Sequence, residues 1–250
     1  MRIGILGGTG PAGSALAARL ASIGYDVVIG SRSRYRAMET CDGLIAKWPD
    51  LATRLEAGDN PAACSCDLLV IATPWDSAAT TAQESEDVLA GKVVVSMANA
   101  LVRVGHEFQP LVPPRGSVAA HVQAAVPRCR VVAAFHHLPA KELGALGSPI
   151  DSDVLICGDD PDAIKAVSEI VERIPGCRPL EAGELSNAMA IEAFTAVLLQ
   201  LNVRYRTRVA PKLTGIKLAA AATSTPVMQS AANDGVAATP EPTAPARTST

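Results

Sequence analysis

The chain has 250 residues and a formal net charge of −3 at neutral pH, and it is 48% hydrophobic but only 3% aromatic. A charge so close to zero gives no general attraction to nucleic acid or to an anionic membrane. No stretch approaches the roughly 20 uninterrupted apolar residues of a membrane span, and an apolar strand begins at once, which leaves no room for a signal peptide. We therefore expect a cytoplasmic protein with neither nucleic acid nor membrane as partner.

The first strand and the first helix enclose a glycine-rich turn. Residues 3–7 form an apolar run, residues 13–23 carry apolar side chains at helical spacing, and Gly8-x-Gly10-x-x-Gly13 stands where they join. These glycines allow a tight turn, a close approach of the backbone to a pyrophosphate, and close packing of helix on strand. The helix N-terminus adds unpaired N–H groups for phosphates. The pattern predicts a dinucleotide-binding site.

The second strand, at 27–30, ends in residues that indicate which dinucleotide is bound. Ser31 and Arg32 stand where an NAD-selective site usually has a carboxylate for the ribose hydroxyls, and Arg34 and Arg36 follow. A guanidinium can donate two hydrogen bonds to one phosphate, whereas a carboxylate would repel it. A solvated helix start is the alternative, and it would account for Arg34 but hardly for Ser31 and Arg32. We expect NADP rather than NAD.

Strand and helix patterns then alternate along the chain. Further strands are expected at 68–72, 93–96 and 131–135, and helices at 34–46, 77–90 and 116–125. Short Val, Ile and Leu strands joined by helical crossovers are typical of a parallel sheet covered on both faces. Pro74 ends one strand where a ligand crevice should lie. The predicted fold class is α/β, a Rossmann-type doubly wound parallel sheet with a smaller C-terminal lobe.

The pattern changes after about residue 138. The elements expected there are a strand at 154–157, a helix at 160–174, a short edge strand at 178–180 and a helix at 186–204. We interpret 1–140 as an NADP-binding domain and 141–218 as a smaller lobe that closes over the nicotinamide half of the cofactor; one continuous domain is the alternative. Residues 219–250 are rich in Ala, Thr and Pro, cannot bury enough surface to offset their ordering entropy, and are expected to form a disordered tail.

No pattern of covalent catalysis stands out. The three tyrosines lack the lysine four residues later that a short-chain dehydrogenase would show, and the cysteines, of which only Cys64 and Cys66 are close-spaced, indicate neither a metal site nor a disulfide. Hydride transfer needs no nucleophile, because it depends on holding two carbons in contact with water excluded. His136 follows the strand at 131–135 and could donate a hydrogen bond or carry a proton; a structural pair with His137 is the alternative.

The charged residues between 203 and 218 are all basic, namely Arg204, Arg206, Arg208, Lys212 and Lys217. Such a run is most often a solvated helix end, favourable to the helix dipole. The alternative is a docking site for a polyanionic ligand tail.

Motifs spread from residue 1 to about residue 218 carry a resemblance to a known family. They are Gly7-Gly8-Thr9-Gly10, Gly30-Ser31-Arg32, Thr73-Pro74-Trp75, His136-x-x-Pro139-Ala140, Cys157-Gly158-Asp159-Asp160, the stretch from Arg178 to Asn187, and Gly215-Ile216-Lys217. In this order and spacing, they resemble the NADPH-dependent reductases of the deazaflavin coenzyme F420. The resemblance implies reversible hydride transfer between NADP(H) and F420, with the deazaflavin stacked on the nicotinamide, and a homodimer.

The resemblance also implies which residues touch the cofactors. Phosphate-loop positions are Thr9, Gly10, Pro11 and Ala12, beside Gly8 and Gly13 of the glycine turn; 2′-phosphate positions are Ser31, Arg32 and Arg36; further NADP positions are Thr73, Ser77, Asn99 and Ala140; and a deazaflavin position is Thr214. A deazaflavin accepts hydride at a ring carbon, so positioning suffices and no catalytic residue is required, with His136 as a contributor.

Two other classes of function remain open at this point. An NADPH-dependent reductase of another acceptor, such as a flavin or a ferric chelate, would keep the glycine turn but would not need the basic run. A non-catalytic NADP sensor would keep the glycine turn and bind a protein partner.

Overall fold

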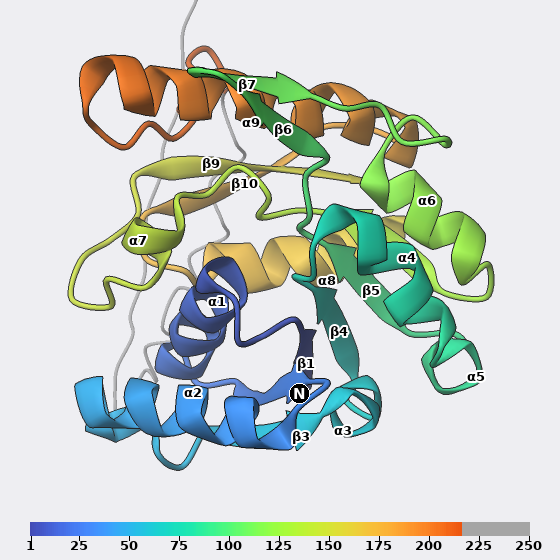
Figure 1. The fold of residues 1–250 in the computed structure, drawn as a ribbon, viewed down its shortest axis with the longest axis vertical. Helices are drawn as coiled ribbons and strands as arrows, with labels where there is room; N and C mark the ends of the chain where they lie inside the picture. Colours follow the sequence, from blue (N-terminus) through green and yellow to red (C-terminus); the bar gives the residue numbers. More distant parts are fainter. Residues whose placement is uncertain (217–250) are drawn as a thin grey trace, which may run out of the picture. The chain divides into compact units, whose positions relative to one another are not determined.

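Eight strands form one sheet in the order β10-β9-β8-β5-β4-β1-β2-β3, within residues 1–216, the part of the chain that this computed structural model describes (Figure 1). The strands are β1 (Arg2–Leu6), β2 (Asp26–Ser31), β3 (Leu55–Asp59), β4 (Leu68–Ile71), β5 (Val93–Ser96), β8 (Arg130–Ala133), β9 (Ser152–Gly158) and β10 (Cys177–Glu181). From β3 to β8 every neighbouring pair is parallel, β9 runs antiparallel to β8, and β10 is parallel to β9. The predicted Rossmann-type sheet is confirmed.

Helices cover both faces of this sheet. They are α1 (Pro11–Ser22), α2 (Arg34–Lys47), α3 (Asn60–Cys64), α4 (Trp75–Gln83), α5 (Glu86–Leu89), α6 (Val118–Ala125), α7 (Ala140–Leu143), α8 (Pro161–Glu172) and α9 (Ala188–Tyr205). Side chains alternate along each strand, so Ile3 and Ile5 of β1 join a core with α1, α2 and α8, whereas Leu6 joins a second core with α3, α4 and α6. The strands are apolar on both faces, so each face of the sheet must be buried in a core.

The long helices and the apolar strands agree with those expected from the sequence, but the short helices α3 and α7 were not predicted, and three further places differ. The helix expected at 77–90 is two helices, α4 and α5, separated at Ser85, whose backbone leaves the helical region (φ −123°, ψ 21°). Strand β3 was not predicted, because it is a half-polar edge strand, Leu-Glu-Ala-Gly-Asp, without an apolar run. The hairpin of β6 (Leu101–Val104) and β7 (Glu107–Pro110) was also missed, since its side chains are largely exposed.

The last part of the described chain extends the same sheet. Strands β9 and β10 belong to the region that the sequence analysis assigns to a smaller lobe, yet β9 pairs with β8 at Val132–Gly158 and Ala133–Cys157. The junction is short, and the division near residue 140 stays a prediction. The predicted tail, 219–250, lies outside the described residues. Within residues 1–216, no helix combines the length and apolarity needed to cross a bilayer.

Candidate functional site

The carboxyl ends of six parallel strands meet at one edge of the sheet, and polar residues follow several of them. In sheet order these are Asn60 after β3, Arg32 after β2, Thr73 after β4, Asn99 after β5 and His136 after β8, with the glycine turn at Gly7 after β1. Ligands of open α/β sheets bind in the crevice at this edge, where the strand order reverses. In this sheet the order reverses at β1, between β2 and β4. The topology therefore places the glycine turn, the arginines and the histidines along one line.

The glycine turn has two positions where a side chain would have different consequences. A Cβ on Gly13 would lie 2.6 Å from the Gly7 carbonyl oxygen, so α1 can approach the turn only because Gly13 has none. A Cβ on Gly10 would meet only that same oxygen, at an ordinary 3.4 Å. Gly10 lines the adjacent pocket, is the N-cap of α1, and makes no side-chain cap. The space beside Gly10 is therefore available to a ligand that binds the N-terminus of α1.

The first pocket lies at the ends of β1, β2, β3 and β4 and has a volume of about 260 Å³. Its lining residues are Gly7, Thr9, Gly10, Ser31, Arg32, Ser33, Arg36, Asn60, Ala72, Thr73, Pro74, Ser77 and Thr81. Two of the polar lining atoms, Asn60 Oδ1 and Thr73 Oγ1, are buried and have no hydrogen-bond partner among the described residues. Buried polar groups are rarely left unpaired, so these atoms indicate a missing ligand partner.

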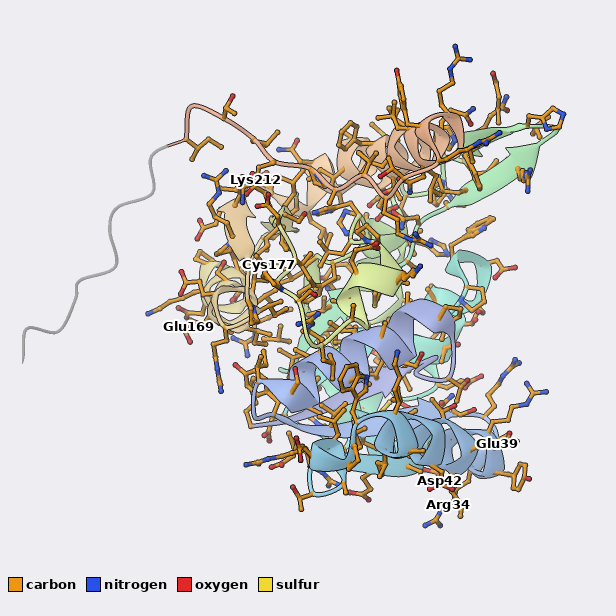
Figure 2. The ribbon with its side chains drawn as sticks, turned by 90° about the vertical axis from the view of Figure 1, so that its left-hand side faces the viewer. Arg34, Glu39, Asp42, Glu169, Cys177 and Lys212 are labelled. Carbon is orange, nitrogen blue, oxygen red and sulfur yellow. The ribbon has the colours of Figure 1, made fainter. Side chains whose placement is uncertain are left out.

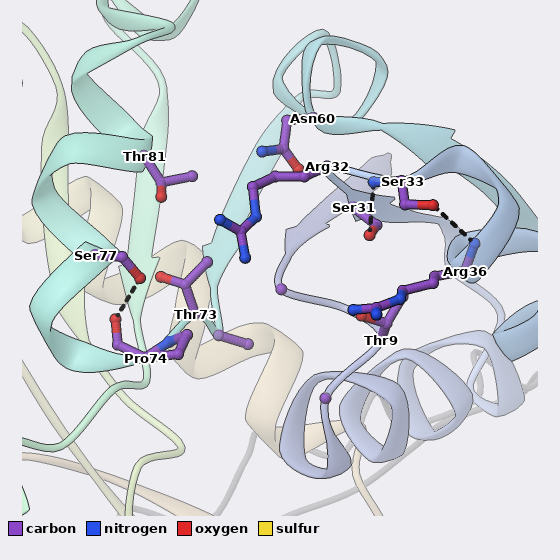
Figure 3. A pocket seen from close by; sticks show the side chains of 13 residues that line it. Thr9, Ser31, Arg32, Ser33, Arg36, Asn60, Thr73, Pro74, Ser77 and Thr81 are labelled. Atoms are coloured by element: carbon purple, nitrogen blue, oxygen red, sulfur yellow. Dashed lines mark hydrogen bonds between the residues drawn. The ribbon is translucent and has the colours of Figure 1, made fainter.

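The arginines after β2 differ in their surroundings. Arg32 extends across the first pocket toward Thr73 and Ser77, and Arg36 lies beside Thr9 (Figure 3). Neither forms an ion pair with a carboxylate in residues 1–216. Two guanidinium groups without a counter-charge in one pocket are suited to a doubly charged phosphate.

Arg34 lies outside the pocket, on the exposed surface of α2 with Glu39 and Asp42 (Figure 2). The start of this helix is ordered by two serines, because Ser31 Oγ accepts from the Ser33 backbone N–H and Ser33 Oγ from that of Arg36. Serine caps thus set the direction from which Arg36 enters the pocket.

The second pocket, of about 230 Å³, lies at the ends of β5 and β8 and is covered by α9. Its lining residues are Asn99, Leu101, the stretch from His136 to Ala140, Thr195, Leu198, Leu199, Asn202 and Val209. The His136 carbonyl oxygen accepts hydrogen bonds from Asn99 Nδ2, at 2.7 Å, and from Thr195 Oγ1, at 3.4 Å. The loops after β5 and β8 are thereby joined to each other and to α9.

Both histidines of the second pocket are buried, and burial lowers their pKa values. The pKa of His136 falls to about 3, with its neighbour His137 adding to the effect, and that of His137 to about 4. Both rings are therefore neutral near pH 7. The His136 ring nitrogens have no partner of good hydrogen-bond geometry within residues 1–216, although the Ala134 backbone lies close enough to oppose the fall in pKa. The ring therefore keeps hydrogen-bonding capacity that a ligand could use. Near pH 7, His136 therefore does not act as an imidazolium acid.

His137 has a structural role. Its Nε2 lies 3.0 Å from the Asp153 carbonyl oxygen and 3.2 Å from the Leu155 backbone nitrogen, both on β9. Phe135, just before the pair, adopts a left-handed backbone (φ 65°) that turns the chain back toward β9. Such a conformation costs on the order of 1–3 kcal/mol in a residue other than glycine. The structural alternative thus holds for His137, while His136 faces the pocket.

A buried arginine connects the two pockets. Arg19 of α1 is 1% exposed, and its guanidinium donates to the carbonyl oxygens of Glu142, Leu143, Ala145 and Ser148. These carbonyls end α7 and continue into the following loop, and α7 begins at Ala140, which lines the second pocket. The helix whose N-terminus borders the first pocket therefore also fixes a wall of the second.

The basic residues after α9 are partly neutralised. Arg208 lies 3.6 Å from Glu142, and Lys212 lies 2.7 Å from Asp151. Arg204 and Arg206 form no ion pair in the described part of the chain. Lys217 lies outside it. The run is thus less available to a polyanion than its sequence alone indicates.

The structure divides the predicted contact residues between the two pockets. Those that line the first are Thr9, Gly10, Ser31, Arg32, Arg36, Thr73 and Ser77; those that line the second are Asn99, His136 and Ala140; Gly8, Pro11, Ala12 and Gly13 form the turn and the first helical turn of α1. Thr214 is exposed and lines neither pocket. The sequence analysis missed Ser33, Asn60 and Thr81 in the first pocket and Thr195 and Asn202 in the second.

A mostly parallel sheet with a glycine turn after β1, arginines after β2 that have no carboxylate partner within residues 1–216, and a pocket at the reversal of strand order defines a dinucleotide-binding protein of the Rossmann type. The family model "NADP oxidoreductase coenzyme F420-dependent" matches residues 2–100. The F420-dependent NADP reductase of Methanocaldococcus jannaschii is 35% identical over 223 residues, covering 87% of this chain and 98% of the relative. The chain belongs to the family of F420-dependent NADP reductases.

Other comparisons agree. The F420-dependent NADP reductase of Methanothermobacter thermautotrophicus is 33% identical, over 83% of this chain and 92% of the relative. A crystal structure from Arthrobacter sp. FB24, provisionally described as an F420-dependent NADP reductase, has the same fold, with a TM-score of 0.71. That comparison covers 84% of this chain and 100% of the other, at 23% identity.

Proposed function

We propose that this protein transfers a hydride reversibly between NADP(H) and the deazaflavin coenzyme F420. The observation that carries the proposal is the pair of pockets along one sheet edge. The first has two arginines without counter-charges beside a glycine turn, and the second is lined by neutral groups. NADPH supplies the hydride, the deazaflavin accepts it at a ring carbon, and one proton from solvent completes the reduced coenzyme.

The first pocket would hold the phosphates of NADP. The turn at Gly8 and Gly10, with the N-terminus of α1, offers backbone N–H groups to the pyrophosphate. Ser31, Arg32 and Arg36 would bind the 2′-phosphate, since they line the pocket after β2. Thr73 and Ser77, after β4, continue the edge toward the second pocket. The chain thus contributes binding and orientation of the donor.

The second pocket would receive the reacting rings. Asn99, His136 and Ala140 line it on one side and residues of α9 on the other, so the pocket would shield part of the rings from water. His136 offers a hydrogen bond from a neutral ring, which suits an acceptor that needs orientation rather than an acid. Holding two carbons in contact in this way is the main requirement of hydride transfer.

A direct assay tests the function. Protein, NADPH and oxidised F420 are mixed, and the visible absorbance of oxidised F420 is followed. We expect it to fall with NADPH and much less with NADH. Reduction of a flavin or a ferric chelate without reduction of F420 would favour a reductase of another acceptor. Binding of NADPH without turnover of any acceptor would favour a sensor.

Three further features belong to the proposal. We expect a homodimer, a cytoplasmic location, and a C-terminal lobe from residue 141 that closes over the nicotinamide. Light scattering tests the first, fractionation of the native host the second, and hydrogen exchange with and without NADPH the third. A monomer by scattering, recovery outside the cytoplasm, or unchanged exchange beyond residue 141 would contradict each in turn.

A further inference from the structure

A buried ion pair lies beside the second pocket, at the start of β9. The Asp153 side chain is 0% exposed, and Arg178 of β10 donates to both its oxygens: Nε to Oδ1 and Nη2 to Oδ2, each at 2.7 Å. The Leu213 backbone N–H donates to Oδ2 at 2.6 Å. Arg178 and this N–H hold the pKa of Asp153 below its usual range against the effect of burial. A carboxylate that accepts three hydrogen bonds is well satisfied.

The same residues hold the chain segment that follows α9. The Asp153 backbone N–H donates to the Pro211 carbonyl oxygen at 2.8 Å, Ser152 Oγ donates to the same oxygen at 3.3 Å, and Arg178 Nη2 donates to the Leu213 carbonyl oxygen at 2.6 Å. This segment, residues 209–214, forms neither helix nor strand. In the described part of the chain, its hydrogen bonds to the sheet all end on Ser152, Asp153 or Arg178.

Both ends of this cluster reach the second pocket. Val209 begins the segment and lines the pocket. On the other side, the Asp153 carbonyl oxygen lies 3.0 Å from Nε2 of His137, which also lines the pocket. Asp153 is therefore hydrogen-bonded to one lining residue, His137, and to the segment that begins at another, Val209, without lining the pocket itself.

We infer that the Asp153 carboxylate is a positioning group that, with Arg178, holds the 209–214 segment in place beside the pocket, and so shapes the pocket for the hydride acceptor. The inference rests on the proposed function only in assigning F420 to that pocket. The carboxylate is required because both of its oxygens accept. An amide at this position has one oxygen and one NH2 group, and the NH2 group would face a donor from Arg178 or Leu213.

Asp153→Asn tests the inference with three readouts. We expect KM for F420 to rise about tenfold or more, the loss of one hydrogen bond to a charged group, while the NADPH Kd from fluorescence titration stays within about twofold. Trypsin should cleave after Arg208 and Lys212 about tenfold faster, because the segment opens more often. Mass spectrometry identifies these cuts.

Matched variants control the experiment. Asp26 forms a half-exposed ion pair with Arg54, at 2.7 Å, at the opposite edge of the sheet. Asp26→Asn removes this pair and should change none of the readouts. Arg178→Lys keeps the charge but cannot bind both oxygens, and should show an intermediate effect. If Asp153→Asn does not fold, Arg178→Lys alone still decides the matter.

The outcomes are distinct. Unchanged cleavage and an unchanged KM for F420 would overturn the inference. Equal loss of NADPH and F420 binding would also overturn it, because that result indicates general destabilisation. If the wild-type protein does not reduce F420 but Asp153→Asn is cleaved faster, the proposed function fails while the anchoring role of Asp153 stands.

Discussion

The two pockets differ most in how their charges are balanced. The arginines of the first pocket have no carboxylate partner among the described residues, whereas two ion pairs lie next to the second, Asp153 with Arg178 and Arg208 with Glu142. Unpaired guanidinium groups select a ligand by its charge, because an anionic group such as a phosphate satisfies them. A neutral pocket selects by shape and by a few hydrogen bonds. On the proposed function, the first pocket would therefore decide which cofactor binds, and the second would decide how the acceptor lies.

The largest expected effect is a steric block of the first pocket. Gly10→Val should raise the NADPH Kd more than about 1000-fold, because the side chain takes the space of the phosphates and several hydrogen bonds to charged groups are lost. The fold should persist, since the new Cβ meets only the Gly7 oxygen, and Gly10 has an ordinary negative φ of −77°. Titration gives the affinity.

Gly13→Ala is the matched control for this block. Its Cβ would lie 2.6 Å from the Gly7 oxygen, so it should lower the melting temperature, whereas Gly10→Val should not. If Gly10→Val lowers the melting temperature as much as Gly13→Ala does, the space beside Gly10 is needed for folding rather than for ligand binding.

A charge substitution in the same pocket comes next. Arg32→Ala should weaken NADPH binding about 100-fold but NADH binding hardly at all, because only NADPH carries the 2′-phosphate. Arg34→Ala, at the start of the same helix but outside the pocket, should affect neither. If Arg32→Ala weakens the binding of NADPH and NADH equally, the Arg32 guanidinium does not contact the 2′-phosphate.

A buried carboxyl near the second pocket makes stability depend on pH. Glu192 of α9 accepts hydrogen bonds from the Val118 and Ala119 N–H groups at the start of α6, and burial raises its pKa to about 7. The folded state therefore binds an extra proton between about pH 4.5 and pH 7. This contribution to stability is full below the lower value and is lost as pH rises through the upper one, by on the order of 3 kcal/mol.

Urea unfolding of Glu192→Gln across this range checks the prediction. The Glu192→Gln variant should not lose stability as pH rises across this range. The Glu84→Gln variant, changed at an exposed carboxyl, should lose stability as the wild type does. The buried histidines act in the opposite sense. Their folded pKa values are lowered, so their contribution is present above about pH 6.5 and is lost as pH falls. An identical pH slope in Glu192→Gln and wild type would show that this carboxyl titrates normally.

The smallest expected effect concerns the chemistry. His136→Ala should lower kcat about tenfold, and at most about 100-fold, because a neutral imidazole contributes orientation and one hydrogen bond. Transfer of deuterium from labelled NADPH to F420 should remain measurable in a single turnover. A variant that binds both coenzymes but transfers no label would show that His136 takes part in the reaction itself.

The sequence predicts the first pocket better than the second for a physical reason. The glycine turn and the arginines lie within the first 36 residues, and their geometry follows from one strand, one turn and one helix. Asn60 escaped prediction because β3, which places it, is an edge strand whose exposed side needs no apolar residues.

The second pocket depends on contacts between residues far apart in the chain. Thr195 contacts His136 from 59 residues away, and Leu213 contacts Asp153 from 60 residues away. No periodicity in the sequence encodes such pairs. The resemblance to known reductases supplied Asn99 and Ala140, but the same reasoning selected Thr214, which lines neither pocket.

Arg19 has a consequence for the engineering of this family. Residues Pro11 and Arg19 are eight apart on one helix, about 12 Å along its axis. One end of α1 borders the first pocket, and Arg19 near the other holds the carbonyls of the loop after α7. The N-terminal glycine turn therefore cannot be exchanged between relatives on its own. A chimera that takes residues 1–33 from a relative must take its 140–148 loop as well, or the distance between hydride donor and acceptor will be reset along with cofactor choice.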